Sequence, residues 1–150
     1  MKHKVLDNIE LIISDSDSFV MEITGYSMLP LLGHRGDKVV IRRVTEVEDI
    51  VRRIALFRSK KGGLIAHRVV ATSNDTVTLQ GDGNPKQKER CSRHEIIGII
   101  EYVLRSNGEV ISCTSKRWRF YEHIWLIQPR IIRSIALAIM RRWMNLTDKR

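Results

Sequence analysis

The sequence predicts a mostly β domain with helices at both ends, in which short antiparallel strands form a folded-up sheet or a partial barrel. About seven short segments rich in branched apolar residues are separated by tight turns, which is typical of an antiparallel sheet that folds over itself. Apolar residues recur at helical spacing near the N-terminus and again in the C-terminal tail. A chain of 150 residues, 43% hydrophobic and 29% charged, suits one domain with a hydrophobic core and excludes a disordered chain.

The expected elements follow one another along the chain. Residues 3–13 place Leu6 and Ile9 on one helical face, which predicts a short amphipathic N-terminal helix. The turn-rich segment 25–36 is expected to be a loop or short helix, and residues 81–93 a glycine-broken loop. Strands are predicted over residues 19–23, 38–44, 54–58, 64–71, 76–80, 96–104 and 109–113.

Two turn sequences predict which strands are neighbours. Residues 60–63, Lys-Lys-Gly-Gly, separate two predicted strands and form a natural hairpin turn. Asn107-Gly108 is the strongest short-range hairpin signal, because both residue types adopt positive φ readily. The strands that flank each turn are therefore expected to pair antiparallel.

Charge divides the chain into a nearly neutral body and a cationic tail. Residues 1–115 hold 17 basic and 15 acidic residues, whereas residues 116–150 hold nine basic and two acidic ones. We therefore expect a domain over residues 1–115 and a basic, amphipathic helical tail over residues 116–150. Arginines and polar residues lie on one side of the second tail helix, and an apolar stripe lies on the other. The stripe consists of Ile132, Ile135, Ile139, Trp143 and Leu146.

An anionic membrane surface is the expected partner of this tail, through a helix that lies in the interface. Its apolar face is too large for a phosphate-binding arm, so nucleic acid is not expected as a partner. No signal peptide is expected, and no transmembrane helix, because Arg133 and Arg141 bound the longest apolar run of the tail. The expected location is the cytoplasmic side of a membrane, peripherally bound. The alternative is that the tail helix caps the protein's own core.

Three short segments carry residue types suited to nucleophilic catalysis. The first, Gly-Tyr-Ser-Met-Leu-Pro, holds Ser27 in a tight loop where Gly25 allows the backbone to bend. The second, Ala-His-Arg-Val-Val, is a predicted strand and holds His67, whose ordinary pKa of about 6.5 suits a general base. The third, Gly-Asp-Gly-Asn, holds Asp82, which can orient an imidazole or simply cap the turn.

These segments resemble the sequence boxes of the signal peptidase I superfamily, which also includes the SOS-repressor-type autoproteases. The nucleophile box of that family reads G-x-S-M-x-P, with a G-D before the next strand. The chain matches it at Gly25, Ser27, Met28, Pro30, Gly36 and Asp37. Bacterial members carry a lysine base before an arginine, and His67-Arg68 is similar to the histidine type instead. The G-D-x-N box of the family is matched by Gly81, Asp82 and Asn84.

The resemblance implies a serine endopeptidase with the family's partial barrel. Ser27 is then the nucleophile, His67 the general base, and Asp82 the candidate third member. The implied substrate is an extended leader or secretory-type peptide with small residues near the cut, bound as an added strand. Cys91 and Cys113 are too few for a cysteine-based metal site and no other cluster has metal-ligand spacing, so no metal or cofactor is expected.

The chain departs from the family pattern at three places. Gly25 stands where a Ser or Thr often donates to the oxyanion, and Arg52-Arg53 replace a second G-D. Residues 86–90, Lys-Gln-Lys-Glu-Arg, stand where further acidic residues often follow the last box, so a third acid from that stretch is expected to be missing.

Two alternatives stay open: a degenerate peptidase that only binds a peptide or membrane, and a self-cleaving regulator, for which residues 1–24 are expected to be too short.

Overall fold

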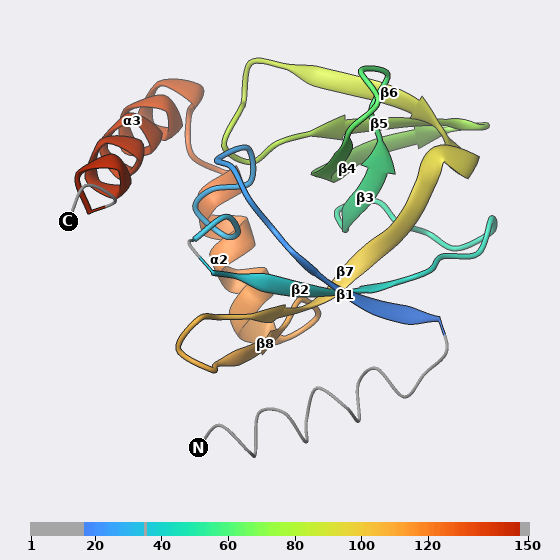
Figure 1. Ribbon diagram of the computed structural model, residues 1–150. Helices are drawn as coiled ribbons and strands as arrows, with labels where there is room; N and C mark the ends of the chain where they lie inside the picture. The colour runs from blue at the N-terminus through green and yellow to red at the C-terminus, as the bar shows by residue number, and fades with distance from the viewer. Residues whose placement is uncertain (1–16, 35, 148–150) are drawn as a thin grey trace.

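The computed structural model describes residues 17–34 and 36–147, which form one antiparallel sheet with two helices beside it (Figure 1). The strands are β1 (Ser18–Glu22), β2 (Lys38–Arg42), β3 (Ile54–Arg58), β4 (Leu64–Ser73), β5 (Thr76–Gln80), β6 (Lys88–Ser92), β7 (Ile96–Leu104) and β8 (Val110–Ser112). The helices are α2 (Lys116–Leu126) and α3 (Arg130–Thr147), with a 3-10 turn at Arg93–Glu95. The predicted mostly β class with additional helices is therefore confirmed.

Strand β7 organises the sheet, because it pairs with β2, β3 and β8. The strand order is β1-β2-β7-β3-β4-β5-β6, and β8 pairs with β7 outside this path. Register shifts interrupt the β2–β7, β3–β7 and β4–β5 pairs, and irregularities of this kind bend the strands. Figure 1 shows the consequence, since β4, β5 and β6 stand over β1 and β2 instead of continuing one flat layer.

Two buried apolar clusters fill the interior of this bent sheet. One contains Val39, Ile41, Leu56, Ile100 and Val103, and the other contains Ile50, Phe57, Val69, Leu79 and Ile99. Neighbouring residues of β3, such as Leu56 and Phe57, belong to different clusters because successive side chains point to opposite faces of a strand. The sheet is thus covered by apolar packing on both faces.

The predicted strands agree with the observed ones, and both predicted hairpins, β3–β4 and β7–β8, are present. The prediction for residues 81–93 is wrong, because this segment is not all loop but contains β6. Strand β6 is an edge strand with the sequence Lys-Glu-Arg-Cys-Ser, and charged edge strands lack the apolar alternation that marks a strand. The predicted helix over residues 3–13 lies outside the described residues.

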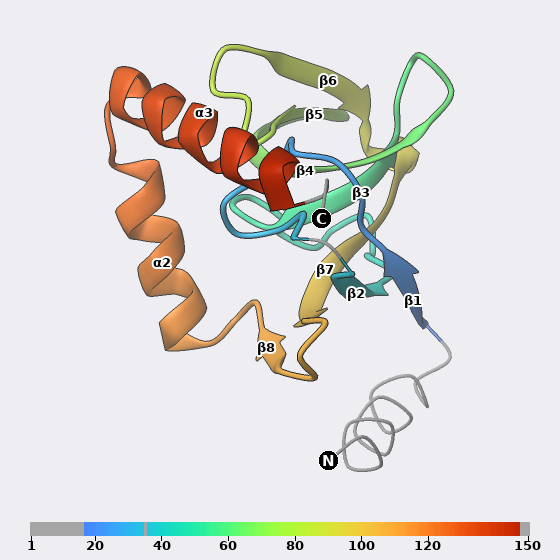
Figure 2. The same cartoon turned by 60° about the vertical axis from the view of Figure 1, so that its left-hand side comes forward.

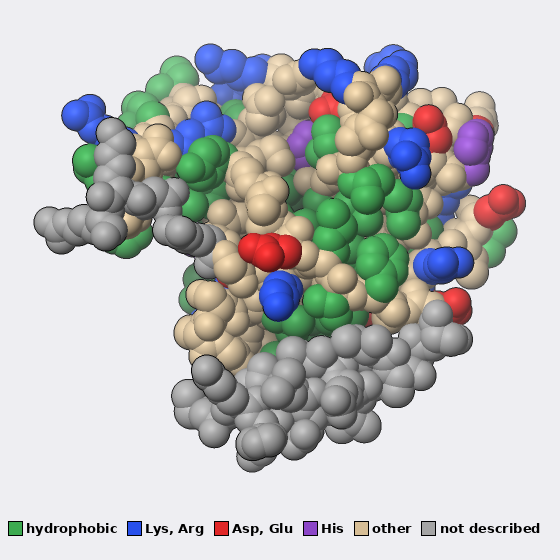
Figure 3. Space-filling model, in the orientation of Figure 1, with side chains coloured by type: hydrophobic (Ala, Val, Ile, Leu, Met, Phe, Trp, Pro, Cys, Tyr) green, Lys and Arg blue, Asp and Glu red, His purple; other side chains and the backbone are tan. Residues whose placement is uncertain are grey.

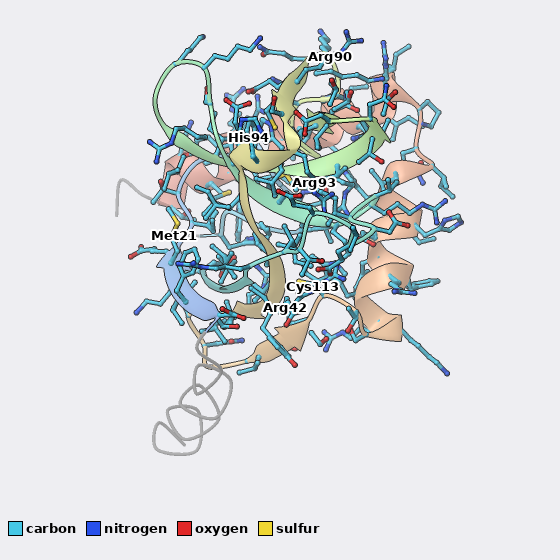
Figure 4. All side chains as sticks on the ribbon, turned by 90° about the vertical axis from the view of Figure 1, so that its right-hand side faces the viewer. Met21, Arg42, Arg90, Arg93, His94 and Cys113 are labelled. Carbon is cyan, nitrogen blue, oxygen red and sulfur yellow. The ribbon has the colours of Figure 1, made fainter. Side chains whose placement is uncertain are left out.

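Two arginines hold the long connection between β2 and β3 against the sheet (Figure 4). Arg93 donates through Nη2 to the carbonyl oxygens of Thr45 at 2.7 Å and Glu48 at 2.8 Å. Arg42 donates to the Glu48 carboxylate and, through Nε, to Glu101 at 2.8 Å. The connection therefore reaches the start of β3 in a fixed position beside β4.

The helices of the tail pack on the sheet domain (Figure 2). Trp118 and Trp125 of α2 are buried, and so is Leu137 of α3. Leu29, from the loop between β1 and β2, packs with Trp125 and Leu137 in a third apolar cluster. One face of the tail thus belongs to the core of the protein. Neither α2 nor α3 combines the length and apolar character needed to cross a membrane.

Candidate active site

The loop between β1 and β2 presents Ser27. Gly25 has a φ of +93°, a backbone conformation that residues with a Cβ rarely adopt, so the turn before Ser27 requires glycine. At the far end of the loop, the buried carboxylate of Asp37 accepts a hydrogen bond from Arg105. Arg105 also donates through Nη2 to the carbonyl oxygen of Leu31 at 2.8 Å. Arg105 therefore fixes the second half of the loop.

His67 reaches the same loop from strand β4. Its side chain is buried, and its ring tilts against Phe57 with 5.9 Å between the ring centroids. A Cβ atom added at Gly81 would lie 3.1 Å from His67 Nε2 and 2.4 Å from the carbonyl oxygen of Ser27. Only glycine fits between the two residues, so Gly81 allows Ser27 and His67 to lie close together.

Ser27 and His67 line one cavity of about 230 Å³ between the end of β1 and the start of β4. The rest of its lining is mainly apolar and includes Met21, Ile23, Met28, Leu56, Ile65 and Ala66. Hydrophobic side chains gather on this face of the molecule (Figure 3), and Met21 is labelled at β1 in Figure 4. Within the described part of the chain, no hydrogen bond joins the side chains of Ser27 and His67.

Glu89, on strand β6, supplies a carboxylate beside the imidazole. Its Oε1 lies 3.6 Å from His67 Nδ1, and its side chain is 28% exposed. That separation is longer than a hydrogen bond, so the interaction is electrostatic, and the buried Nδ1 has no hydrogen-bond partner among the described residues. Glu89 reaches this position because β6 pairs with β5, with Glu89 opposite Leu79.

Asp82 does not take the position beside the imidazole that the sequence predicts. Both of its carboxylate oxygens accept hydrogen bonds from Arg68, from Nε at 2.8 Å and from Nη2 at 2.6 Å, and both side chains are buried. Arg68 also donates to the carbonyl oxygen of Arg52 at 2.7 Å and to the carboxylate of Glu122 on α2. Arg68 and His67 are successive residues of β4 and point to opposite faces, so the partner of Arg68 is not available to His67.

Burial sets the protonation of His67. Desolvation lowers the pKa of His67 below its ordinary value, and the negative charges of Glu89 and Asp82 oppose that effect. A lowered pKa keeps the imidazole neutral near pH 7, which is the form that can accept a proton. Burial also acts against the charge of Arg68, but its hydrogen bonds to Asp82 keep the pKa of Arg68 above the ordinary value. Arg68 and Asp82 therefore form a structural ion pair.

The sequence motifs predict Ser27 and His67 as site residues, and both line one cavity. The motifs do not predict Glu89, which lies in residues 86–90, where a third acid was expected to be missing. Only the pairing of β6 with β5 shows that this glutamate faces His67. Residues 17–34 and 36–147 contain no group of three His, Cys, Asp or Glu side chains arranged to hold a metal ion.

The chain matches no family model and no curated protein. Its function must therefore be inferred from the chemistry and geometry of the site.

Proposed function

We propose that the protein is a serine endopeptidase of signal-peptidase type, in which Ser27 is the nucleophile and His67 the general base. The observation that carries this proposal is the cavity lined by both residues. Glycine is the only residue type that fits between them, and Gly81 occupies that position. The partial barrel of that family is part of the proposal, and the bent antiparallel sheet is compatible with it.

The proposed reaction begins with attack of Ser27 Oγ on the carbonyl carbon of the scissile peptide bond. His67 takes the hydroxyl proton as the new C–O bond forms, and then gives it to the amine as the C–N bond breaks. Water, activated by the same imidazole, hydrolyses the acyl-enzyme and regenerates the hydroxyl. The backbone N–H of Ser27 is a candidate donor to the oxyanion.

Glu89 takes the role that the sequence analysis gave to Asp82. Its charge lies beside Nδ1 of His67, whereas Nε2 lies on the side of Gly81 and the Ser27 backbone. When the imidazole gains a proton at Nε2, the positive charge is stabilised by the neighbouring carboxylate. Asp82 is therefore proposed to support the loop through Arg68 and not to act on the imidazole.

An extended peptide is the proposed substrate. Strand β1 pairs with β2 only, so its other edge is open to a further strand within the described sheet. The end of this edge, at Met21, Ile23 and Thr24, lines the cavity that also holds Ser27. A cavity of about 230 Å³ with apolar walls favours small apolar side chains next to the cut.

An anionic membrane surface on the cytoplasmic side is the proposed partner of the tail. The face of α3 away from the sheet exposes large apolar side chains, and Figure 3 shows basic side chains next to hydrophobic ones in this region. The exposed set is Ile131, Ile132, Ile135, Ile139, Trp143 and Leu146. Arg130 and Arg142 are exposed on the same helix, and the combination of an apolar stripe with flanking cations suits an interfacial helix.

A catalytically inactive peptide-binding module is the second candidate. It is favoured by the absence of a hydrogen bond between the Ser27 and His67 side chains and by Gly25 in place of an oxyanion-donating hydroxyl residue. The two candidates differ in whether Ser27 reacts.

Labelling with a fluorophosphonate probe distinguishes the two candidates. The wild-type protein is expected to be labelled, and Ser27→Ala is expected to abolish labelling. His67→Ala is expected to slow it by about 10³-fold, because nucleophile and base act as a unit. Mapping the modified peptide shows whether the probe is attached to Ser27 or to another residue. A folded wild-type protein that neither reacts with the probe nor hydrolyses peptides presented on anionic vesicles would support the binding module instead.

A further inference from the structure

Side chains of helix α3 donate hydrogen bonds to backbone carbonyl groups of the loop that follows β5. Arg133 Nη2 donates to the carbonyl oxygen of Asp82 at 3.2 Å, and Arg141 Nη2 donates to that of Gly83 at 2.7 Å. Trp125 of α2 donates through Nε1 to the Asp82 oxygen as well, at 3.1 Å. Three donors of the tail therefore converge on two successive peptide carbonyls.

The same short segment is bonded to the nucleophile loop. The backbone N–H of Gly83 donates to the carbonyl oxygen of Ser27 at 2.8 Å. A Cβ atom at Gly83 would lie 2.2 Å from the carbonyl oxygen of Tyr26, so the two loops are in direct backbone contact. Tyr26 in turn donates through its hydroxyl to Asn145 Oδ1 of α3 at 3.1 Å. Helix α3 thus contacts both loops that surround Ser27.

We propose that α3 is a positioning element for the nucleophile, with Arg141 as its principal positioning residue, and that a membrane bound to its outer face raises turnover. The inference rests on the proposed function. Arg141 holds the Gly83 carbonyl, Gly83 holds the Ser27 carbonyl, and this chain sets the position of the Ser27 side chain relative to His67. Arg141 touches neither the substrate nor the reacting atoms.

The two faces of α3 can be occupied at the same time. Leu137 lies on the inner face, where it is buried against Leu29, whereas Ile139 and Trp143 are 64% and 68% exposed on the outer face. A membrane that binds the apolar stripe on the outer face therefore does not compete with the sheet domain, which contacts the inner face. Because an amphipathic segment binds an interface as a helix, the membrane favours the helical, docked form of α3 over frayed forms.

Arg142 provides a matched control for Arg141. The two residues are adjacent, carry the same charge and are both exposed, but Arg141 donates to the carbonyl oxygen of Gly83, whereas Arg142 makes no hydrogen bond or ion pair among the described residues. Substitution of either by Met removes one positive charge from the same helix and affects attraction to an anionic membrane equally. Only the substitution of Arg141 removes the hydrogen bond to the loop.

The decisive experiment compares Arg141→Met, Arg141→Lys and Arg142→Met in the full-length protein, with and without vesicles of phosphatidylglycerol and phosphatidylcholine. Arg141→Met is expected to lower kcat about tenfold with KM nearly unchanged, the loss expected for one charged hydrogen bond, and to remove most of the stimulation by vesicles. Arg141→Lys is expected to restore part of kcat. Without vesicles and at a saturating vesicle concentration, Arg142→Met is expected to keep the kcat of the wild type, because it loses the same positive charge as Arg141→Met but no hydrogen bond to the loop. Equal losses in the two Met variants, or none in either, would overturn the proposal.

Amide hydrogen exchange gives a readout that needs no peptidase activity. Arg141→Met is expected to speed exchange of the Gly83 amide, which donates to Ser27, and Arg142→Met to leave it unchanged. If the wild type is inactive but exchange at Gly83 depends on Arg141 alone, the positioning inference stands and the peptidase proposal fails. If exchange at Gly83 is the same in both Met variants, the positioning inference fails whatever the activity.

Discussion

Replacement of Glu89 by Gln removes the charge beside His67 and keeps the size of the side chain. The carboxylate lies 3.6 Å from Nδ1, a separation at which two unit charges interact by about 4–5 kcal/mol for an effective dielectric constant of about 20. Glu89 is 28% exposed, and exposed pairs are worth about 1 kcal/mol or less, so solvent screening reduces the figure. We take about 1–2 kcal/mol as the stabilisation of the imidazolium, which corresponds to a loss of about tenfold in kcat.

The same substitution also changes the pH dependence. Burial lowers the pKa of His67 and the charge of Glu89 opposes this, so removal of the charge lowers the pKa of His67 further. Since neutral His67 is the active base, the acidic limb of kcat/KM is expected below pH 6.5 in the wild type and at still lower pH in Glu89→Gln. In Glu89→Gln, kcat on the plateau at neutral pH is therefore lower than in the wild type, and the acidic limb of kcat/KM lies at lower pH.

The assay is the pH profile of kcat and kcat/KM for hydrolysis of a peptide with small residues at the cut. Glu46→Gln serves as the control, because it removes the same charge at an exposed residue. The control is expected to match the wild type in both plateau and limb. A Glu89→Gln variant with an unchanged plateau, or with a limb that moves to higher pH, would refute the electrostatic role of Glu89.

The other predictions concern stability and membrane binding. Asp82→Asn is expected to destabilise the protein by about 3 kcal/mol in urea denaturation, because the buried Arg68 loses the charge of its buried partner and keeps only that of Glu122. Activity that falls while stability stays unchanged would instead indicate a direct role of Asp82 in catalysis. Ile139→Glu is expected to weaken sedimentation with anionic vesicles strongly and to leave the melting temperature nearly unchanged, because Ile139 is exposed. Raised salt is expected to weaken wild-type binding without abolishing it; a wild type that ignores anionic vesicles contradicts the membrane proposal.

Local patterns in the sequence were sufficient for most of the fold. The alternation of apolar and polar residues over positions 76–80 and the turn at Asn107-Gly108 involve residues only a few positions apart. The first predicted strand β5 and the second predicted the β7–β8 hairpin, and both are observed. The need for glycine at position 25 is local too, since it arises from a positive φ. The residues Ser27 and His67 were identified from their chemistry and their surrounding motifs.

Long-range pairing decided what the sequence left open. Strand β6 is a charged edge strand, so only its pairing with β5 brings Glu89 to His67. The sequence motifs suggest that Asp82 pairs with His67. Successive side chains of β4 point to opposite faces, however, and Arg68, not His67, lies on the side of Asp82 and binds it.

The cationic charge of the tail and the apolar stripe of its last helix can be predicted from residue types alone, because charge belongs to single residues and the helical period is fixed. The packing of the helix on the body sets its orientation: the stripe faces outward, while Leu137 and Arg141 reach the loops around Ser27. Helical periodicity gives the relative angles of side chains, but not which face meets the body, since that depends on partners more than 50 residues away in the chain, such as Gly83.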